Sequence, residues 1–552
     1  MYLHPEPAVI RRHFARVGSR LVHYRRAGHG SPLLLLHQSP TSSAEMASNV
    51  LAFAEHFTVI APDTPGYGLS DPLALAQPDM EDYADALAGL LDALGIARCG
   101  LYGTHTGAMI AAEFARRFPA RTAAAVLDGY VVLTQPEREE LLARYFVDIP
   151  PRADGGHLAW YWSRIRDQVI FFPWYDRRQG TRMRFDVPPA EALQPYVLDL
   201  LRAERMGTPA YAAAFRYPAV ERATGWTAPV WLLNYAQDAI ADHPERLGPL
   251  PSAVRREALP DPDTLQARAV EIFTEATLDL PVPAPGAEPA DAGRTWLDTP
   301  AGQLLLRRGG RGPAQVLLHA PGMSSRDWLE LSIEVREALA WCAPDLPGHG
   351  DSAAMWPANL ERLLDVLEQL LVAAGEGAGL LALEETGWFA LALRARRPEL
   401  RLTLVDLALP SGVAAAARLA PDLAPCDHGG HLLAAWQRVR DAELFRPWDH
   451  PSLDHSLSRE FEVSPARVHR RCVDLLKAAD ALPAISATLG GLDVPALLAV
   501  PGAPVRFAAR AGNGAERDVA AAAALAGQDH ETWPAALADW PVTLLAGPSH
   551  ER

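Results

Sequence analysis

The sequence is almost free of lysine. Lys477 is its only lysine among 552 residues, so nearly all positive charge is carried by arginine. Schiff-base chemistry, which needs a lysine amine, is therefore excluded from the first half of the chain. A formal charge of −16 also leaves too few basic residues for the footprint that a polyanion requires. We expect neither a nucleic acid nor an anionic membrane as a partner.

Cysteine and long apolar runs are scarce as well. The four cysteines, Cys99, Cys342, Cys426 and Cys472, have no C-x-x-C spacing, which is typical of reduced thiols and argues against a cysteine-based zinc site. The first residues lack the apolar core of a signal peptide, and no uncharged run of about 18 apolar residues follows. We expect a cytoplasmic protein, and we predict no metal and no cofactor.

The length predicts more than one domain. A chain of 552 residues exceeds the roughly 250 to 300 residues at which a single hydrophobic core stops growing. Hydrophobic residues make up 49% and charged residues 21%, a composition typical of a globular protein. We predict domains at residues 1–280 and 294–552, joined by a linker at 281–293 that is rich in proline, alanine and glycine.

Strand and helix patterns alternate in the first half. The apolar run at 33–36 and the segment 57–60 are typical of buried strands, and each leads into a loop. A stretch with helical spacing from Tyr83 to Leu94 precedes a further strand that ends at Gly103. This alternation predicts an α/β fold, with a mostly parallel, doubly wound sheet that is covered by helices on both faces.

The same pattern starts again in the second half. The strand and loop at His37 recur at His319, and the turn after Asp63 recurs after Asp345. The residues shared without a gap by a third pair of blocks are His157, Leu158, Trp162, Arg164, Arg166, Asp167, Phe171, Pro173 and Trp174, which match His431, Leu432, Trp436, Arg438, Arg440, Asp441, Phe445, Pro447 and Trp448. We predict a tandem duplication whose halves pair within the chain, and we leave a homo-oligomer open.

A glycine-containing turn follows the strand that ends at Gly103. Its sequence, from Leu101, is Leu-Tyr-Gly-Thr-His-Thr-Gly, and a helical stretch comes next. This segment resembles the G-x-S-x-G turn of the α/β-hydrolase superfamily, with His105 in place of the nucleophilic serine. The resemblance covers both halves nearly end to end. It implies two tandem α/β-hydrolase folds, each with a helical cap, at about 135–225 and about 412–485.

The resemblance also implies roles for residues around His105. The oxyanion hole of the family maps to the backbone N–H groups of Gln38 and Thr106, and its acid position maps to Asp238. No histidine occurs in residues 257–265, where the last triad member would stand, so a Ser-His-Asp triad cannot be assembled in this half. Because His105 would lie at a helix N-terminus, we expect a lowered pKa and a neutral ring near pH 7.

The second half departs from the family in another way. Its turn is Leu383-Glu384-Glu385-Thr386-Gly387, with Glu385 in the place of the nucleophile. Its acid position falls near Pro501-Gly502, without a carboxylate, and His530 appears near the place of the last triad member. A carboxylate at this turn is similar to the nucleophilic aspartate of haloalkane dehalogenases. The missing first glycine argues against the same geometry, so we interpret Glu385 as a helix cap and the second half as degenerate.

The cap predicted in the first half is rich in aromatic side chains. The predicted substrate contacts are His37, Trp160, Tyr161 and Arg164. His37 also has a structural interpretation, because the family often has a histidine that orients this loop. For His157 two roles stay open: its recurrence as His431 suggests a part in folding the cap, whereas a position above His105 would suggest a part in catalysis.

Two function classes stay open. The first is an enzyme that acts on a small carbonyl-containing or aromatic molecule through His105 as base or nucleophile, oriented by Asp238 or Asp128, in a hydrolytic or lyase-type reaction. The second is a non-catalytic protein that binds a ligand and uses its second half as a scaffold. A third interpretation is a metal site built from His105, His157 and a carboxylate such as Asp128.

Overall fold

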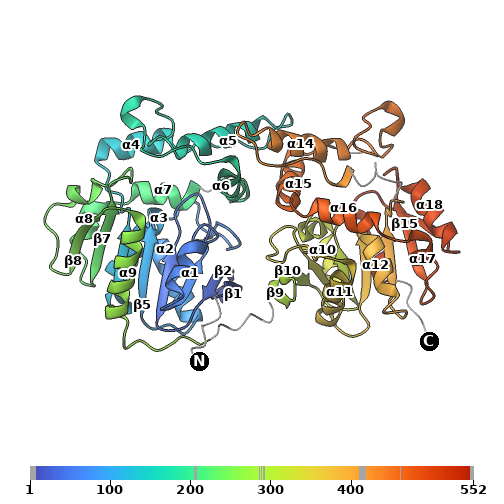
Figure 1. Ribbon diagram of the computed structural model, residues 1–552, viewed down its shortest axis with the longest axis horizontal. Helices are drawn as coiled ribbons and strands as arrows, with labels where there is room; N and C mark the ends of the chain where they lie inside the picture. The colour runs from blue at the N-terminus through green and yellow to red at the C-terminus, as the bar shows by residue number, and fades with distance from the viewer. Residues whose placement is uncertain are drawn as a thin grey trace. The chain divides into compact units, whose positions relative to one another are not determined.

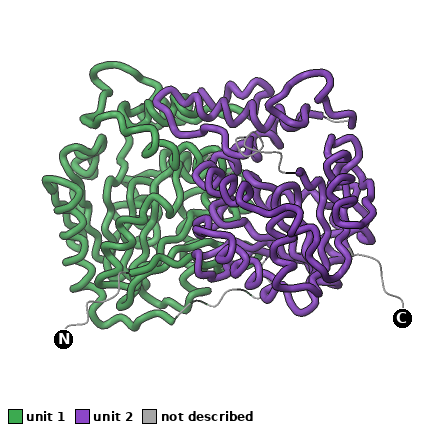
Figure 2. The backbone as a smooth tube through the Cα atoms, turned by 45° about the vertical axis from the view of Figure 1, so that its right-hand side comes forward, with its two compact units in different colours: residues 1–150, 160–292 green, residues 151–159, 293–552 purple. Residues whose placement is uncertain are grey.

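The computed structural model describes residues 8–203, 208–284, 286, 289, 293–409, 418–459 and 462–546. The chain divides into two compact units (Figure 2). Unit 1 comprises residues 1–150 and 160–292, and unit 2 comprises residues 151–159 and 293–552. No helix within the described ranges is both long enough and apolar enough to cross a membrane.

Unit 1 is built on an eight-stranded sheet with the order β1-β2-β4-β3-β5-β6-β7-β8. Pairing is antiparallel from β1 through β2 to β4 and parallel across the rest. The strands are β1 Arg11–Val17, β2 Arg20–Ala27, β3 Pro32–Leu36, β4 Thr58–Pro62, β5 Cys99–Thr104, β6 Thr122–Asp128, β7 Val230–Tyr235 and β8 Val254–Leu259. The strands predicted at 33–36 and 57–60 correspond to β3 and β4.

Helices cover both faces of this sheet (Figure 1). They are α1 Ala47–Phe53, α2 Met80–Ala93, α3 Thr106–Arg117 and α9 Pro262–Ala276. Leu34 and Leu36 pack with the apolar residues of α2 and α3, whereas Leu33 and Leu35 pack with those of α1 and α9. Because successive side chains of a strand point to opposite faces, an unbroken apolar run such as β3 requires cover on both sides.

The segment between β6 and β7 is helical. It contains α4 Gln135–Arg144, α5 Gly156–Gln168, α6 Ala190–Arg202, α7 Thr208–Arg216 and α8 Ala219–Ala223. The first turn of α5 is grouped with unit 2 and the remainder with unit 1. The predicted cap falls on this segment, and the bounds that we gave it stay a prediction.

Unit 2 contains a second eight-stranded sheet, with the order β9-β10-β12-β11-β13-β14-β15-β16. Its strands are β9 Arg294–Thr299, β10 Gly302–Gly309, β11 Ala314–Leu318, β12 Ala340–Pro344, β13 Gly379–Leu383, β14 Leu402–Val405, β15 Val505–Arg510 and β16 His530–Trp533. The order and the directions repeat those of unit 1. The predicted fold class, two α/β folds with mostly parallel sheets, is therefore confirmed.

The helices of unit 2 are distributed along the chain in a similar way. They are α10 Ile333–Ala338, α11 Leu360–Ala374, α12 Thr386–Arg394, α14 Gly430–Ala442, α15 Pro465–Ala478, α16 Leu482–Gly490, α17 Val494–Leu498, α18 Glu516–Leu525 and α19 Val542–Ala546. As in unit 1, helices lie between β14 and β15.

The two repeated sequence blocks share their local structure. Each begins with a 13-residue helix, α5 or α14, and each contains an isolated bridge, Phe171 to Arg182 in one and Phe445 to Ser456 in the other. The matching histidines also make the same contact: Nδ1 of His157 accepts the N–H of Arg152, and Nδ1 of His431 accepts the N–H of Cys426, both at 3.2 Å. In both blocks the histidine thus holds the turn that precedes its helix.

Candidate active site

The turn from β5 into α3 presents His105. This residue lies between the end of β5 and the start of α3, with φ 46° and ψ −106°. Its backbone N–H donates to the carbonyl oxygen of Asp128 at 2.9 Å. Residues with a side chain rarely adopt such a positive φ, so the surrounding structure must hold the turn in place.

Two glycines make this turn possible. A Cβ atom on Gly107 would collide with the backbone of Leu36 at the end of β3, and one on Gly103 would collide with the backbone of Gly107. Only glycine allows the helix and the strands to approach this closely. The strand-to-helix turn that the sequence predicted around His105 is therefore formed.

Two of the predicted carboxylates lie beside His105. Its Nε2 is 3.2 Å from Oδ2 of Asp238, and the His105 side chain is 41% exposed whereas that of Asp238 is 2% exposed. Oδ1 of Asp238 accepts the backbone N–H of Ile240 at 3.1 Å, which fixes the carboxylate. The Tyr102 hydroxyl donates to Asp128 at 2.6 Å.

The charge state of His105 differs from our expectation. Burial by itself would lower the pKa of the ring, but the carboxylates of Asp238, Asp128 and Glu45 outweigh burial and raise the pKa to about 9. The predicted neutral imidazole is therefore wrong, because the helix N-terminus is countered by nearby negative charges. For the carboxyl group of Asp128, burial acts in the opposite direction and raises the pKa to about 6.

The predicted oxyanion hole is partly occupied by a side chain. The backbone N–H of Gln38 donates to Oε1 of Glu45 at 3.0 Å, and the side-chain amide of Gln38 donates to Oε2 at 3.1 Å. Thr106, the second predicted donor, is buried at the start of α3. Sequence reasoning missed Glu45, since no fixed spacing marks a loop carboxylate that folds back onto Gln38. Burial raises the pKa of Glu45.

A small cavity of about 220 Å³ opens beside His105. The described residues that line it are Gln38, Glu45, Met46, Asn49, Thr104, His105, Asp128, Tyr196 and Tyr235. None of the four predicted substrate contacts is among them. Tyr196, on α6 within the segment of the predicted cap, and Asn49, on α1 after β3, were also missed, because no spacing in the sequence connects them with His105.

The predicted substrate contacts serve other parts of unit 1. Both ring nitrogens of His37 bind backbone groups: Nδ1 donates to the carbonyl of Gln38 at 2.7 Å, and Nε2 accepts the N–H of Thr64 at 2.9 Å. The structural interpretation of His37 therefore accounts for its contacts. In α5, the Trp160 ring packs edge-on against the rings of Tyr161 and Trp174. The guanidinium group of Arg164 lies over the Trp174 ring, 5.4 Å from its centroid.

His157 is grouped with unit 2 instead of with His105. It is fully buried, its Nε2 is 3.0 Å from Nδ1 of His469, and its ring meets Trp436 edge-on at 4.9 Å. Burial and the neighbouring His469 lower the pKa of His157 to about 4. These contacts lie within unit 2 and suit the part in folding that stays open for His157, and its part in catalysis stays a prediction. Throughout the described ranges, no three His, Cys, Asp or Glu side chains gather in the way that a metal ion needs.

The corresponding turn of unit 2 presents Glu384. This residue has φ 52°, and its N–H donates to the carbonyl of Val405 at 2.8 Å, as the N–H of His105 does to Asp128. Leu383 pairs with Val405 in the register in which Thr104 pairs with Asp128. The sequence pattern predicts Glu385 at this position. Glu384 is the equivalent residue, because one extra residue separates the strained position from α12.

The other two triad positions of unit 2 also differ from those that we assigned. Asn513 corresponds to Asp238. Asp238 lies three residues after Tyr235, the last residue of β7, and Asn513 lies three residues after Arg510, the last residue of β15. Each donates its backbone N–H to the carbonyl oxygen of that last residue at 3.1 Å. His530 is exposed at the start of β16, where it pairs with Phe507, and so stands away from the carboxyl ends of the strands.

Comparison with known proteins points to hydrolases. Residues 31–152 match the family model described as alpha/beta hydrolase fold. An uncharacterized hydrolase of Saccharomyces cerevisiae is 29% identical over 196 residues, which are 34% of this chain and 63% of that protein. The 2-hydroxy-6-oxononadienedioate/2-hydroxy-6-oxononatrienedioate hydrolase of Burkholderia vietnamiensis is 41% identical over 113 residues, 20% of this chain and 39% of that protein.

Among solved structures, that of E-2-(acetamidomethylene)succinate hydrolase is similar to part of the chain, with 21% identity and a TM-score of 0.38 over 48% of this chain and all of that one. The similarity to the relatives from Saccharomyces cerevisiae and Burkholderia vietnamiensis spans less than two thirds of the length of each of those proteins. The match over residues 31–152 and the hydrolase relatives support a similarity to the α/β-hydrolase superfamily.

Proposed function

We propose that unit 1 is an enzyme that acts on a small carbonyl-containing or aromatic molecule, by hydrolysis or by a lyase-type cleavage, through a site centred on His105 instead of a serine. The observation that carries the proposal is the placement of His105 at the strained strand-to-helix turn, with Asp238 at 3.2 Å from its Nε2. Strained residues of this kind cluster at functional sites.

The charge state assigns the roles. With a pKa of about 9, His105 is an imidazolium near pH 7 and donates a proton or a hydrogen bond to oxygen that becomes negative during reaction. Asp238 orients the ring and balances its charge. Asp128, whose pKa is about 6, and Glu45 supply carboxylates in the same cavity that can accept a proton from the substrate or from water.

The size of the cavity limits the substrate. At about 220 Å³ it is smaller than the roughly 300 to 1,000 Å³ of pockets that enclose drug-sized ligands. The carbonyl preference of the proposal is supported by the relative from Burkholderia vietnamiensis, which is named for an oxo-dienedioate substrate. Tyr196 and Tyr235 provide aromatic walls for the organic part of such a molecule.

One observation favours the second function class. Glu45 already binds the Gln38 N–H, which an oxyanion would need, so a ligand could bind in unit 1 without being turned over. In that case the chain would be a non-catalytic binding protein with unit 2 as its scaffold.

Turnover assays with matched variants test the proposal. We would offer the purified full chain small esters, enol esters, oxo-dienoates and cyanohydrins, and compare wild type with His105→Ala and with the control His56→Ala, whose side chain is exposed. We expect His105→Ala to lower kcat/KM at least about 100-fold, the usual contribution of a proton donor, and His56→Ala to leave it unchanged. Full activity in His105→Ala would overturn the proposal, and binding without any turnover by wild type would favour the second class.

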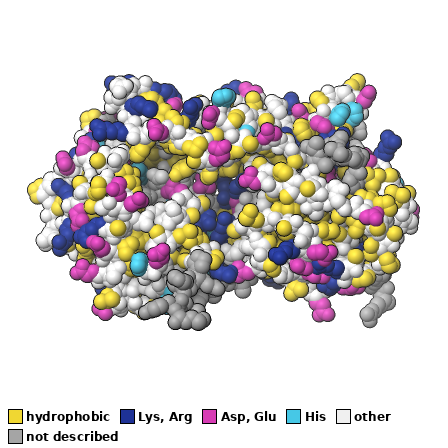
Figure 3. Space-filling model, viewed as in Figure 1, with side chains coloured by type: hydrophobic (Ala, Val, Ile, Leu, Met, Phe, Trp, Pro, Cys, Tyr) yellow, Lys and Arg dark blue, Asp and Glu magenta, His cyan; other side chains and the backbone are white. Residues whose placement is uncertain are grey.

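The proposal also includes the location of the protein, the class of its partner and its domain organisation. All four cysteines are free thiols, in keeping with the proposed cytoplasmic location. Acidic and basic side chains are interspersed on the face shown in Figure 3, which supports a small molecule over a polyanion as the partner. We also propose the tandem duplication, the domain bounds at 280 and 294, and pairing of the halves or of chains.

A further inference from the structure

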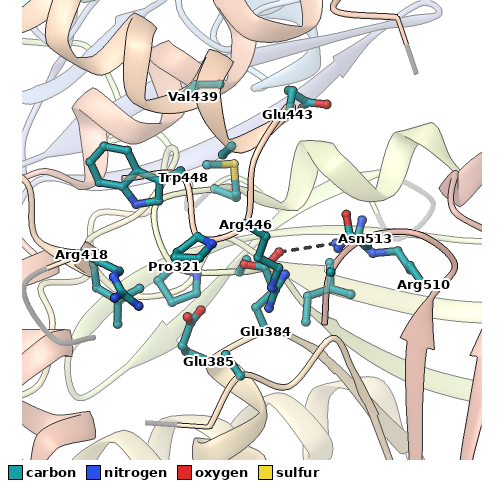
Figure 4. Close-up of a pocket in the computed structure, with 18 of the residues that line it drawn as sticks. Pro321, Glu384, Glu385, Arg418, Val439, Glu443, Arg446, Trp448, Arg510 and Asn513 are labelled. Carbon is teal, nitrogen blue, oxygen red and sulfur yellow. Dashed lines mark hydrogen bonds and ion pairs between the residues drawn. The ribbon is translucent and has the colours of Figure 1, made fainter. Parts of the chain in front are cut away.

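Unit 2 contains a cavity of about 1350 Å³, much larger than the one beside His105. Its described walls come from unit 2 alone and include the turn at Glu384 and Glu385, helix α14 and the loop that follows it. Figure 4 shows the Glu385 carboxylate and the Arg446 guanidinium directed into the same space, with Arg418 and Trp448 to one side and Arg510 to the other.

Two arginines in this cavity retain unused hydrogen-bonding capacity. Arg438, on α14, has its Nε buried with no hydrogen-bond partner among the described residues, and its guanidinium lies over the Trp448 ring at 4.4 Å. Burial lowers the pKa of Arg438 to about 10, which leaves it charged near pH 7. Arg446 donates from one of its nitrogens to the carbonyl oxygen of Asp406 at 3.2 Å. A buried guanidinium group without full pairing is costly unless a ligand completes its hydrogen bonds.

Two other arginines of this cavity, Arg418 and Arg510, are already paired. Arg418 binds Asp449 at 3.0 Å, and Arg510 binds Asp406 as well as Glu384, the latter at 3.4 Å. Among the described residues that line the cavity, Glu385 carries a carboxylate close enough to interact with both Arg446 and Arg438. The lining beside them is apolar and includes Trp448, Phe445 and Leu457.

We propose that this cavity of unit 2 is a binding site for an organic monoanion, a carboxylic acid with an apolar body, whose carboxylate lies between Arg438 and Arg446 and whose body packs against Trp448. Arginine's planar donors match a carboxylate in geometry, and the guanidinium already stacked on Trp448 is held ready for it. Unit 2 then contributes recognition of a ligand and is more than a scaffold.

Glu385 explains why a monoanion fits. Burial, together with the like charge of Glu384, raises the pKa of Glu385 to about 7 against the opposing effect of Arg446 and Arg438. Protonation of Glu385 removes one negative charge from beside the two guanidinium groups, one ligand carboxylate replaces that charge, and the protonated Glu385 becomes a hydrogen-bond donor. A bound carboxylate favours this protonated form, so affinity should fall as the pH rises from 6 to 8.

Calorimetric titration of the full chain tests the site. The probes are 2-naphthoate, its neutral analogue 2-naphthamide, and inorganic phosphate, each at pH 6 and pH 8. The variants are Arg438→Gln, Glu385→Gln and the control Arg440→Gln, since Arg440 lies on the same helix, pairs with Asp441 and is 39% exposed. His105→Ala, in unit 1, shows which unit binds the probe.

We expect 2-naphthoate to bind one per chain, at least about ten-fold tighter than 2-naphthamide or phosphate. Arg438→Gln should weaken binding at least about ten-fold, Glu385→Gln should bind at pH 8 as tightly as at pH 6, and Arg440→Gln and His105→Ala should bind as wild type does. Equal binding of acid and amide, tighter binding of phosphate, loss of binding in His105→Ala, or unchanged binding in Arg438→Gln would each overturn the proposal. If Arg438→Gln fails to fold, the pH response of Glu385→Gln decides.

Discussion

Asp238→Asn isolates the charge that sets the ionisation of His105. The substitution keeps the shape of the side chain, and its oxygen can still accept the N–H of Ile240, so the loop should stay in place. What is lost is the negative charge 3.2 Å from Nε2. In the wild-type chain that carboxylate is the largest of the influences that raise the pKa of His105 to about 9, with Asp128 and Glu45 behind it.

The size of the effect follows from the exposure of the ring. A change of one pKa unit corresponds to about 1.4 kcal/mol, but an exposed ion pair contributes only about 0 to 1 kcal/mol because solvent screens it. The His105 side chain is 41% exposed but that of Asp238 only 2%, so we expect the upper end of this range, a fall of about 0.7 pKa unit in Asp238→Asn. Asp128 and Glu45 keep it above the ordinary value.

Nuclear magnetic resonance titration of the labelled histidines measures this pKa. The chain has 18 histidines, and His105→Ala assigns the signal. The control is Asp242→Asn, a carboxylate of the same loop that is 71% exposed, which should leave the pKa of His105 unchanged. A wild-type pKa at or below 6.5, or no response to Asp238→Asn, would refute the reasoning.

Linkage adds a stability readout to the same variant. Because the folded pKa of His105 lies above its ordinary value of about 6.5, protonation stabilises the fold fully below pH 6.5 and this stabilisation is lost as the pH rises through about 9. The free energy of unfolding lost in Asp238→Asn should thus be larger at pH 6 than at pH 10. An equal loss at both values would contradict the pairing.

Three further outcomes are expected. His157→Ala should lower the free energy of unfolding by about 1 to 3 kcal/mol in urea titrations, because it removes a buried acceptor of a backbone N–H, and should leave the turnover by unit 1 unchanged. Gly107→Ala should destabilise the fold by about 2 kcal/mol or more in the same assay, whereas Gly180→Ala, which meets no atom within 4 Å, should be tolerated. Glu45→Gln should lower the pKa of His105 less than Asp238→Asn does, because the Glu45 carboxylate raises that pKa less than the Asp238 carboxylate does. Histidine titrations measure both shifts.

Much of the fold was readable because its signals are local or periodic. The run at β3 is apolar throughout, so it had to be buried on both faces, and the recurrence of the His37 loop at His319 predicted a second α/β fold, which the second sheet confirms. The turn at His105 was also predictable, because its two glycines occupy positions where no side chain fits.

The electrostatics of the site could not be read in the same way. The pKa of His105 depends on Asp238 and Glu45, which lie far apart in the sequence and meet only in the folded chain. The sequence also assigned Glu385, and not Glu384, as the counterpart of His105. The residue with positive φ is Glu384, and its place is set by the register of β13 with β14 and not by the glycine that follows. Likewise, the segment that carries His157 is grouped with unit 2, which no local pattern indicates.

The central claim, that a protonated His105 performs the chemistry of unit 1, is tested most directly by the pH dependence of kcat/KM for a substrate that wild type turns over. We expect activity to fall as the pH rises through about 9, at a midpoint that moves down in Asp238→Asn, and to be lost in His105→Ala. A rate that is independent of pH between 7 and 10, with His105→Ala as active as wild type, would contradict it.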